Sequence, residues 1–456
     1  MKRFAVLLVF VIICLSLTVA LLNLSSIESL MRPPKLSGEN SLLQHAFEKT
    51  VSDSDGIVMK NPLSGEYTST YLFFDMNNDG QEEAFVFYSD LSEDNLACVS
   101  IFKMNDNSWS FVSKIKCKSE EIYEVNFADI NGDKIYEILL SNKNMDDIQA
   151  VSATEFSSFG NKNLSIYSFG EASTTLLKTE IYSNLFISDL NNDEADDLVL
   201  LNINLTDREK KTSSRILSFN EDYSVKQDKS VLLTGMLEVY NIVTDTFVNN
   251  GIEHTRVYVD GAISERGVIT EVIDISHDNF ELILPLYENN QSSQPITLRA
   301  SKILSTDFDG DNLIEIPTFD VFPHAEYILK GTNERVPFNV TVWNELNDNS
   351  LIIDKKCVQN SFYKYFLIID DKWLNAISFV YDSNNQTINF YYVEPNGTLG
   401  EDIFSIRTFS LPEWSRNDSD YSQLAETSSY VYAVKFNDDE RIKFDDYIKQ
   451  NFYVYN

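Results

Sequence analysis

Cysteine is scarce in this chain of 456 residues. Of its four cysteines, Cys14 lies within an apolar N-terminal run, which leaves Cys98, Cys117 and Cys357 for the rest of the chain. An odd set of three does not make a disulfide framework. Cys98 and Cys117 are spaced so that they could bridge one hairpin, but a small buried thiol is the more ordinary role for such residues.

Histidine is equally rare, and the sequence has no G-x-S-x-G element, Walker loop or dinucleotide-binding fingerprint. The four histidines are His45, His254, His277 and His324. None of them has a neighbouring nucleophile or paired acid at a spacing that suggests a catalytic site. These absences argue against an enzyme. The four tryptophans are expected to pack in the core, with a glycan or peptide platform as the alternative: Trp109, Trp343, Trp373 and Trp414.

Positive charge is also in short supply. The chain has 36 Lys and Arg against 70 Asp and Glu, which gives a formal net charge of -34. This excess of acid makes nucleic acid and a bare anionic lipid surface poor partners and a cation a natural one. Hydrophobic residues (43%) and aromatic residues (12%) are plentiful, so the chain can bury a sizeable core and favours strands.

The N-terminus has the layout of a signal anchor or signal peptide. Lys2 and Arg3 precede an almost wholly apolar run, Phe4–Leu22, which is long enough to span a bilayer. The two basic residues would stay inside, so the rest of the chain is expected outside. An uncleaved anchor is the first interpretation, with cleavage after the small residues around Ala20 or lipidation at Cys14 as alternatives.

Four segments share one pattern, in which an apolar strand runs into an acidic loop and then into a second apolar strand. They are Tyr71–Tyr88, Val125–Leu140, Leu185–Leu201 and Ile303–Ile316. The first aspartates of successive loops are 54, 60 and 118 residues apart. Because the last spacing is twice 59, a repeat that has lost its acids is expected near position 248. There Asp245–Gly261 keeps two strands around an Asn-Gly turn.

Further strand-like stretches lie between the loops. Ala97–Lys103 and Trp109–Lys116 follow the first loop, and Asn163–Phe169 and Thr174–Ile181 follow the second. Four short antiparallel strands in each repeat predict a mainly β fold, a β-propeller of about five four-stranded blades. The alternative is a ring of seven blades that includes the C-terminal region.

Oxygen-bearing side chains occupy positions 1, 3, 5 and 9 of each loop, and position 7 can add its main-chain carbonyl. The predicted ligands are Asp75, Asn77, Asp79, Gln81 and Glu83; Asp129, Asn131, Asp133, Ile135 and Glu137; Asp189, Asn191, Asp193, Ala195 and Asp197; and Asp307, Asp309, Asp311, Leu313 and Glu315. Hard oxygen ligands in this number suit Ca²⁺, and no His or Cys takes part. The closing acid at position 9 begins a strand, which distinguishes these loops from an EF-hand.

These loops resemble those of the FG-GAP and VCBS-type repeats, the calcium-binding blades of integrin α-chain propellers and of many exported bacterial proteins. The family pattern is D-x-[DN]-G-D-G-x-x-[DE] between strands, and the resemblance covers about residues 67–344. Glycine is kept at position 6 as Gly80 and at position 4 as Gly132 and Gly310. The loop from Asp189 has neither glycine, so Asn192 and Glu194 must adopt tight backbone geometry there, for which Glu194 is the worse suited. The chain also resembles exported proteins of low-GC Gram-positive bacteria, a likeness that implies no activity.

The predicted organisation has five parts. Residues 1–22 form the signal segment, 23–40 a tether, 41–56 a helix and turn, 57–344 the propeller repeats and 360–456 a small α+β domain. The expected function is a non-catalytic, calcium-binding module for binding or adhesion at the cell surface, with a protein or glycan as partner at the propeller face. Alternatives are a structural or assembly component of the envelope and, further off, a propeller-type glycoside hydrolase or lyase.

Overall fold

The computed structural model describes residues 39–52, 54, 56–105, 108–143, 161–204, 211–264, 267–276, 279–283, 286–287, 296–416, 420–437 and 440–455. The predicted signal segment 1–22 and nearly all of the tether lie outside these residues, as does His277. Within the described part, no helix is both long enough and apolar enough to span a membrane.

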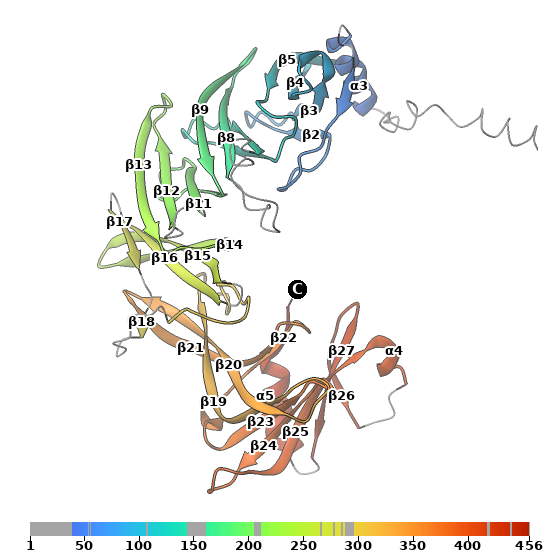
Figure 1. Cartoon of the computed structure of the whole chain (residues 1–456), viewed down its shortest axis with the longest axis vertical. Coiled ribbons are helices and arrows are strands. Elements are labelled where there is room, and N and C mark those ends of the chain that lie inside the picture. Colours follow the sequence, from blue (N-terminus) through green and yellow to red (C-terminus); the bar gives the residue numbers. More distant parts are fainter. Residues whose placement is uncertain are drawn as a thin grey trace, which may run out of the picture. The chain divides into compact units, whose positions relative to one another are not determined.

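The chain is mainly β and contains several four-stranded antiparallel units, as the sequence predicts (Figure 1). The first sheet follows helix α3 (Glu39–Thr50), whose Leu43 and Phe47 pack against it. It consists of β1 (Ile57–Met59), β2 (Tyr71–Phe74), β3 (Glu83–Asp90), β4 (Ala97–Asn105) and β5 (Ser108–Lys116). Strands β1 and β2 pair with successive stretches of β3.

Three further sheets follow the same plan, each strand pairing with the next along the chain. The second sheet is β6 (Glu124–Ala128), β7 (Glu137–Lys143), β8 (Lys162–Phe169) and β9 (Thr174–Tyr182). The third is β10 (Asn184–Ser188), β11 (Asp197–Asn204), β12 (Lys211–Phe219) and β13 (Val225–Leu233). The fourth is β14 (Glu238–Asn249), β15 (Ile252–Ser264), β16 (Gly267–Ser276) and β17 (Asn279–Ile283).

The last sheet has eleven strands and runs to the end of the described chain. Its strands are β18 (Leu286–Tyr287), β19 (Ile316–Ile328), β20 (Arg335–Asn347), β21 (Ser350–Asn360), β22 (Tyr365–Ile368), β23 (Ile377–Asp382), β24 (Thr387–Val393), β25 (Leu399–Ser410), β26 (Ser422–Glu426), β27 (Tyr430–Phe436) and β28 (Phe452–Val454). Two helices accompany it, α4 (Leu411–Trp414) and α5 (Arg441–Asn451).

The predicted domain start at residue 360 does not coincide with an edge of this sheet. A register shift between Val321 and Glu326 divides β19, and the second half of that strand pairs with β20 on one side and in parallel with β23 on the other. The C-terminal strands therefore belong to the same sheet as β19 and β20. One hydrophobic cluster includes residues from β20, β23, β24 and β25, with Val340, Phe379, Phe390 and Phe404 among its buried members.

Neighbouring sheets share hydrophobic cores, as stacked repeats must. Leu72 and Phe85 of the first sheet pack in one cluster with Ile138 of the second. Val199 of the third sheet packs in another with Val257 of the fourth. The described chain consists of two compact units, and residues 128–133 belong with the part from Glu180 onward rather than with β7.

The repeat predicted near position 248 is present. Strands β14 and β15 form a hairpin whose turn holds Asn250 at φ 51° and Gly251 at φ 79°. Two successive positive φ values are typical of the tight turn that an Asn-Gly pair favours. The hairpin lies where the other repeats carry an acidic loop, between the first and second strands of the unit. The strand, Asn-Gly turn and strand predicted for this segment are therefore confirmed, as part of a four-stranded sheet.

The three cysteines that the structure describes form no disulfide. Cys98, Cys117 and Cys357 are all buried and unbridged, so the ordinary alternative to a hairpin disulfide is the correct one. Burial raises the pKa of Cys117 and of Cys357 to about 12. Both side chains therefore act as small apolar groups rather than as reactive thiolates.

A buried ion pair fastens the segment before the last acidic loop to the fourth sheet. Arg299 Nη2 lies 2.8 Å from Asp260 Oδ1, and both side chains are 0% exposed. Asp260 also accepts hydrogen bonds from Thr270 Oγ1 and from the main chain and hydroxyl of Ser305. Arg299 Nε donates to the carbonyl of Ile303. Each charge is thus satisfied, and removing either one leaves the other buried without a counter-charge.

Asp260→Asn is expected to lower the free energy of unfolding by about 3–5 kcal/mol, because it leaves a buried guanidinium without a counter-charge at nearly unchanged volume. Urea denaturation measures this change. The matched control is Glu326→Gln, which breaks the exposed pair with Arg335 and should cost about 1 kcal/mol or less. Equal effects of the two substitutions would contradict this account of the buried pair.

Candidate metal centre

The four acidic loops occupy equivalent places in their units. The Asp75 loop (residues 75–83) joins β2 to β3, the Asp129 loop (129–137) joins β6 to β7, and the Asp189 loop (189–197) joins β10 to β11. The Asp307 loop (307–315) leads into β19 and is closed by a bridge between Thr306 and Glu315. In every loop, position 9 is the first residue of the next strand or directly precedes it.

All four loops adopt one backbone conformation. Positions 4 and 6 have positive φ in each of them: Asn78 (53°) and Gly80 (82°), Gly132 (75°) and Lys134 (68°), Asn192 (57°) and Glu194 (67°), and Gly310 (85°) and Asn312 (72°). Left-handed backbone costs a side chain other than glycine roughly 1–2 kcal/mol. The Asp189 loop keeps the shape without either glycine, so the fold holds it against the preference of Glu194.

The carboxylate at position 1 organises the curl of the loop. Asp75 accepts the N–H groups of Asp79 and Gly80 at 3.2 and 2.9 Å. Asp189 likewise accepts those of Asp193 and Glu194 at 3.2 and 2.9 Å. In the third case, Asp307 accepts the main-chain N–H groups of Gly310 and Asn312 at 2.7 and 3.1 Å. Position 1 is thus fixed by the main chain of its own loop.

The acid at position 9 closes the loop from within the core. Glu83, Glu137, Asp197 and Glu315 are between 0 and 3% exposed. The main-chain N–H of position 2 donates to this acid in three loops: Met76 to Glu83 at 3.0 Å, Leu190 to Asp197 at 2.9 Å, and Phe308 to Glu315. Each of these carboxylates is consequently buried beside the other acids of its loop.

Burial and the neighbouring carboxylates disfavour ionisation of the closing acid. Burial, and then the charges of Asp309, Asp311 and Asp307, raise the pKa of Glu315 to about 7. The pKa of Asp197 is raised to about 6, mainly by burial, with Asp193 and Asp189 adding to the shift. A cation placed among these oxygens would favour the ionised carboxylates and so lower both pKa values again.

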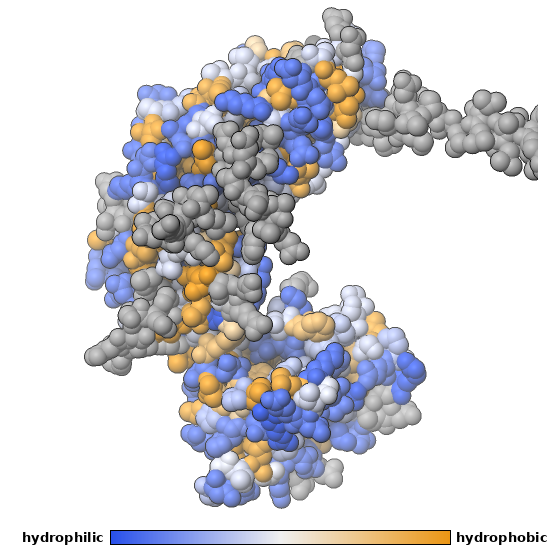
Figure 2. Space-filling model, viewed as in Figure 1, coloured by the Kyte–Doolittle hydropathy of each residue, from blue (hydrophilic) through white to orange (hydrophobic). Residues whose placement is uncertain are grey.

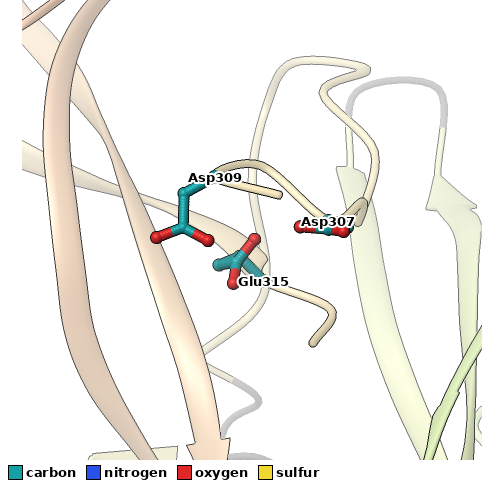
Figure 3. Close-up of side chains that lie close together, drawn as sticks. All are labelled: Asp307, Asp309 and Glu315. Atoms are coloured by element: carbon teal, nitrogen blue, oxygen red, sulfur yellow. The ribbon is translucent and has the colours of Figure 1, made fainter. Parts of the chain in front are cut away.

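The Asp307 loop brings three acids closest together. Oxygens of Asp307, Asp309 and Glu315 lie within 4.8 Å of one another (Figure 3). Two oxygens bound to one Ca²⁺ at about 2.4 Å can be no more than about 4.8 Å apart, so this spacing fits a single ion. Glu315 Oε1 is buried and has no hydrogen-bond partner. An acceptor left in that state favours a cation as its partner.

The other loops hold their acids more loosely. No other such group of three was found among the described residues. Position 3 is Asn in these loops, and its amide donates to the position 5 carboxylate in two of them, Asn77 to Asp79 and Asn131 to Asp133, each at 3.0 Å. In the Asp189 loop, Lys226 Nζ is paired with Asp193. That lysine pairs with one predicted ligand, as Lys355 Nζ does with Asp309 of the Asp307 loop at 3.5 Å.

Some predicted ligands are not tested by this geometry. Asp311 lies outside the group of three and accepts the N–H of Leu313 at 2.8 Å. The position 7 residues Gln81 and Ala195 donate their N–H groups to position 5 in the same way. Ligation by the position 7 carbonyls stays a prediction. Lys226 was missed by sequence reasoning, because it lies 33 residues beyond Asp193 and only the folded sheet brings them together.

The other residues noted in the sequence mostly serve packing. Trp343 and Trp373 are 3 and 6% exposed and belong to hydrophobic clusters, as expected for core tryptophans. His254 Nδ1 lies 2.7 Å from Asp274 Oδ1. The view in Figure 2 shows hydrophilic residues widely spread over the described surface, in keeping with the acidic composition.

No protein-family model and no curated protein sequence matches this chain. Among solved structures, a Bacillus subtilis levansucrase is similar at 8% identity and a TM-score of 0.25, covering 68% of this chain and 94% of the levansucrase chain. The β-propeller domain of the trilobed protease from Pyrococcus furiosus is similar at 12% identity and a TM-score of 0.26, covering 74% and 95%. TM-scores this low support no argument about fold or activity.

Proposed function

We propose that this protein is an extracytoplasmic calcium-binding protein of the FG-GAP/VCBS repeat type, and that its loops stiffen a non-catalytic module for binding or adhesion. The observation that carries the proposal is the Asp307 loop, where three acids surround a position suited to one cation and a buried Glu315 oxygen lacks a partner. The common backbone of all four loops extends the proposal to the other three.

Calcium suits these loops better than other cations. All the predicted ligand atoms are oxygens, so the loops offer none of the nitrogen and sulfur donors that zinc and copper prefer. The ligand oxygens come from a short, curled segment and include main-chain carbonyls, a flexible set that Ca²⁺ tolerates at 2.3–2.6 Å and that the strict octahedron of Mg²⁺ does not. The residues present therefore fit calcium, which would supply charge neutralisation and rigidity rather than a chemical step.

The proposed role follows from where the loops lie. Each one joins two strands of a unit, and neighbouring units share cores, so fixing the loops fixes the joints between strands. We propose that the four units with β1–β17 and the fifth, led by the Asp307 loop and β19, are five blades of a propeller, with seven as the alternative count. A protein or glycan partner would bind the face that these units present. A structural component of the cell envelope is the second candidate.

Chelation is expected to lower the melting temperature by several degrees, and added Ca²⁺ should restore it more effectively than equal Mg²⁺. Calcium at about 100 times its dissociation constant stabilises the folded state by about 2.7 kcal/mol for each site. Differential scanning calorimetry measures the shift. A melting temperature indifferent to calcium would refute the proposal.

The loops should also differ in strength. Asp307→Asn with Asp311→Asn is expected to remove more of the calcium-dependent stability than the matched pair Asp189→Asn with Asp193→Asn. The Asp307 loop has four acids at its ligand positions and the Asp189 loop has three. One lysine pairs with an acid of each loop, Lys355 with Asp309 at 3.5 Å and Lys226 with Asp193. The same calorimetry, with and without calcium, ranks the two pairs, and the opposite order would show that the ranking is wrong.

Export is a separate part of the proposal and rests on the sequence of residues 1–22. Protease added to intact cells should remove nearly all of the chain, while the N-terminal segment stays with the membrane fraction. A chain recovered intact from the cytosol would contradict this orientation and leave the metal proposal untouched.

A further inference from the structure

Asp196 lies in the Asp189 loop at position 8, which is outside the predicted ligand positions. Its Oδ2 accepts the main-chain N–H of Asp129 at 3.0 Å, and its own N–H donates to the Asp129 carbonyl at 2.8 Å. Asp129 is the position 1 ligand of the preceding loop and is 8% exposed. The first ligand residue of one loop is therefore held by a reciprocal pair of hydrogen bonds from the next loop.

A second ligand residue of the Asp129 loop is held from the same direction. Asn131, at position 3, is 5% exposed, and its amide donates to the carbonyl of Glu221 at 3.2 Å. Glu221 lies in the turn between β12 and β13, which belong to the same sheet as the strands around the Asp189 loop. Gly132, between these two ligands and Asp133, faces Ala195, whose Cβ would lie 3.6 Å from a Cβ added at that glycine.

The contact made by position 8 recurs along the chain. In the Asp129 loop, the N–H of Tyr136 donates to the carbonyl of Met76, in the preceding Asp75 loop, at 2.8 Å. In the Asp307 loop, the N–H of Ile314 donates at 3.0 Å to the carboxylate of Asp245. The unit with Asp245 has a tight hairpin instead of a loop, so a buried side chain there replaces the loop acceptor. Asp196 adds a side-chain hydrogen bond to a predicted ligand residue of the preceding loop, Asp129.

We propose that Asp196 is a positioning residue that couples calcium binding in the Asp129 and Asp189 loops. This inference rests on the proposed calcium function. An ion in the Asp189 loop fixes residues 189–197, including Asp196, and thereby orders Asp129 before an ion reaches the Asp129 loop. The second ion then meets a loop whose ordering cost is already partly met, which gives positive cooperativity. The Asp307 loop follows a unit without an acidic loop and should bind independently of both.

Hydrogen exchange measured by mass spectrometry on the full chain during a calcium titration tests the coupling, because peptides from β6–β7, β10–β11 and residues 303–316 report on the three loops separately. Asp189→Asn should move the midpoint of calcium-dependent protection in the Asp129 loop to about fivefold higher calcium or more. The Asp307 loop should keep its midpoint and serves as the internal reference.

The Asp196 variants decide whether that residue carries the coupling. In an Asp196→Ala background, Asp189→Asn should leave the midpoint of the Asp129 loop unchanged, whereas Asp196→Asn, which keeps an acceptor oxygen, should preserve most of the shift. If calcium increases protection in every loop but Asp189→Asn leaves the midpoint of the Asp129 loop unchanged, the inference is wrong and the calcium proposal still stands. Protection that ignores calcium in all loops of the unmodified chain would refute the proposed function itself.

Discussion

The buried acid at position 9 is the constraint on which the rest of the site depends. Glu315 directly precedes β19, accepts the N–H of Phe308 and keeps one oxygen without a partner. Burial alone disfavours its charge, and the acids at positions 1, 3 and 5 disfavour it further, so its pKa rises to about 7. The proposed cation among the oxygens would offset this repulsion.

The same constraint links metal binding to the architecture. Because the closing acid begins the second strand of its unit or directly precedes it, the proposed ion would tie that strand to the loop residues that follow the first strand. Position 8, one residue earlier, hydrogen-bonds to the preceding unit in three of the loops. Ligand geometry, strand pairing and contact between neighbouring units thus meet within two residues. The unit with Asn250 and Gly251 has no acidic loop, but its Asp245 carboxylate still accepts the N–H of Ile314 in the next unit.

Those features that depend on local chemistry could be predicted from the sequence. The spacing of the aspartates located all four loops, and the Asn-Gly pair marked the hairpin because its two positive φ values are strongly residue-specific. The family pattern also placed Glu194 at a position of tight backbone geometry, and its positive φ agrees with that prediction although the residue is poorly suited to it. The ligand pattern gave no hint that Lys226 would pair with Asp193.

Features that depend on distant segments were beyond local patterns. The parallel pairing of β19 with β23 continues one sheet across residue 360, and neither strand carries a signal for it. The Arg299 and Asp260 pair joins segments 39 residues apart, and either residue alone would be assigned to the surface. Asp196 was overlooked for a similar reason, because its role lies in a neighbouring unit.

The most direct measurement is a crystal structure of the chain grown with calcium, with anomalous diffraction data to identify the ion. The account predicts a calcium peak in the Asp307 loop, bonded to Asp307, Asp309 and Glu315 at about 2.3–2.6 Å. Weaker peaks are expected in the other three loops, and none at Asn250 and Gly251. A well-ordered Asp307 loop with water or a lysine nitrogen at that position, in a crystal saturated with calcium, would contradict it.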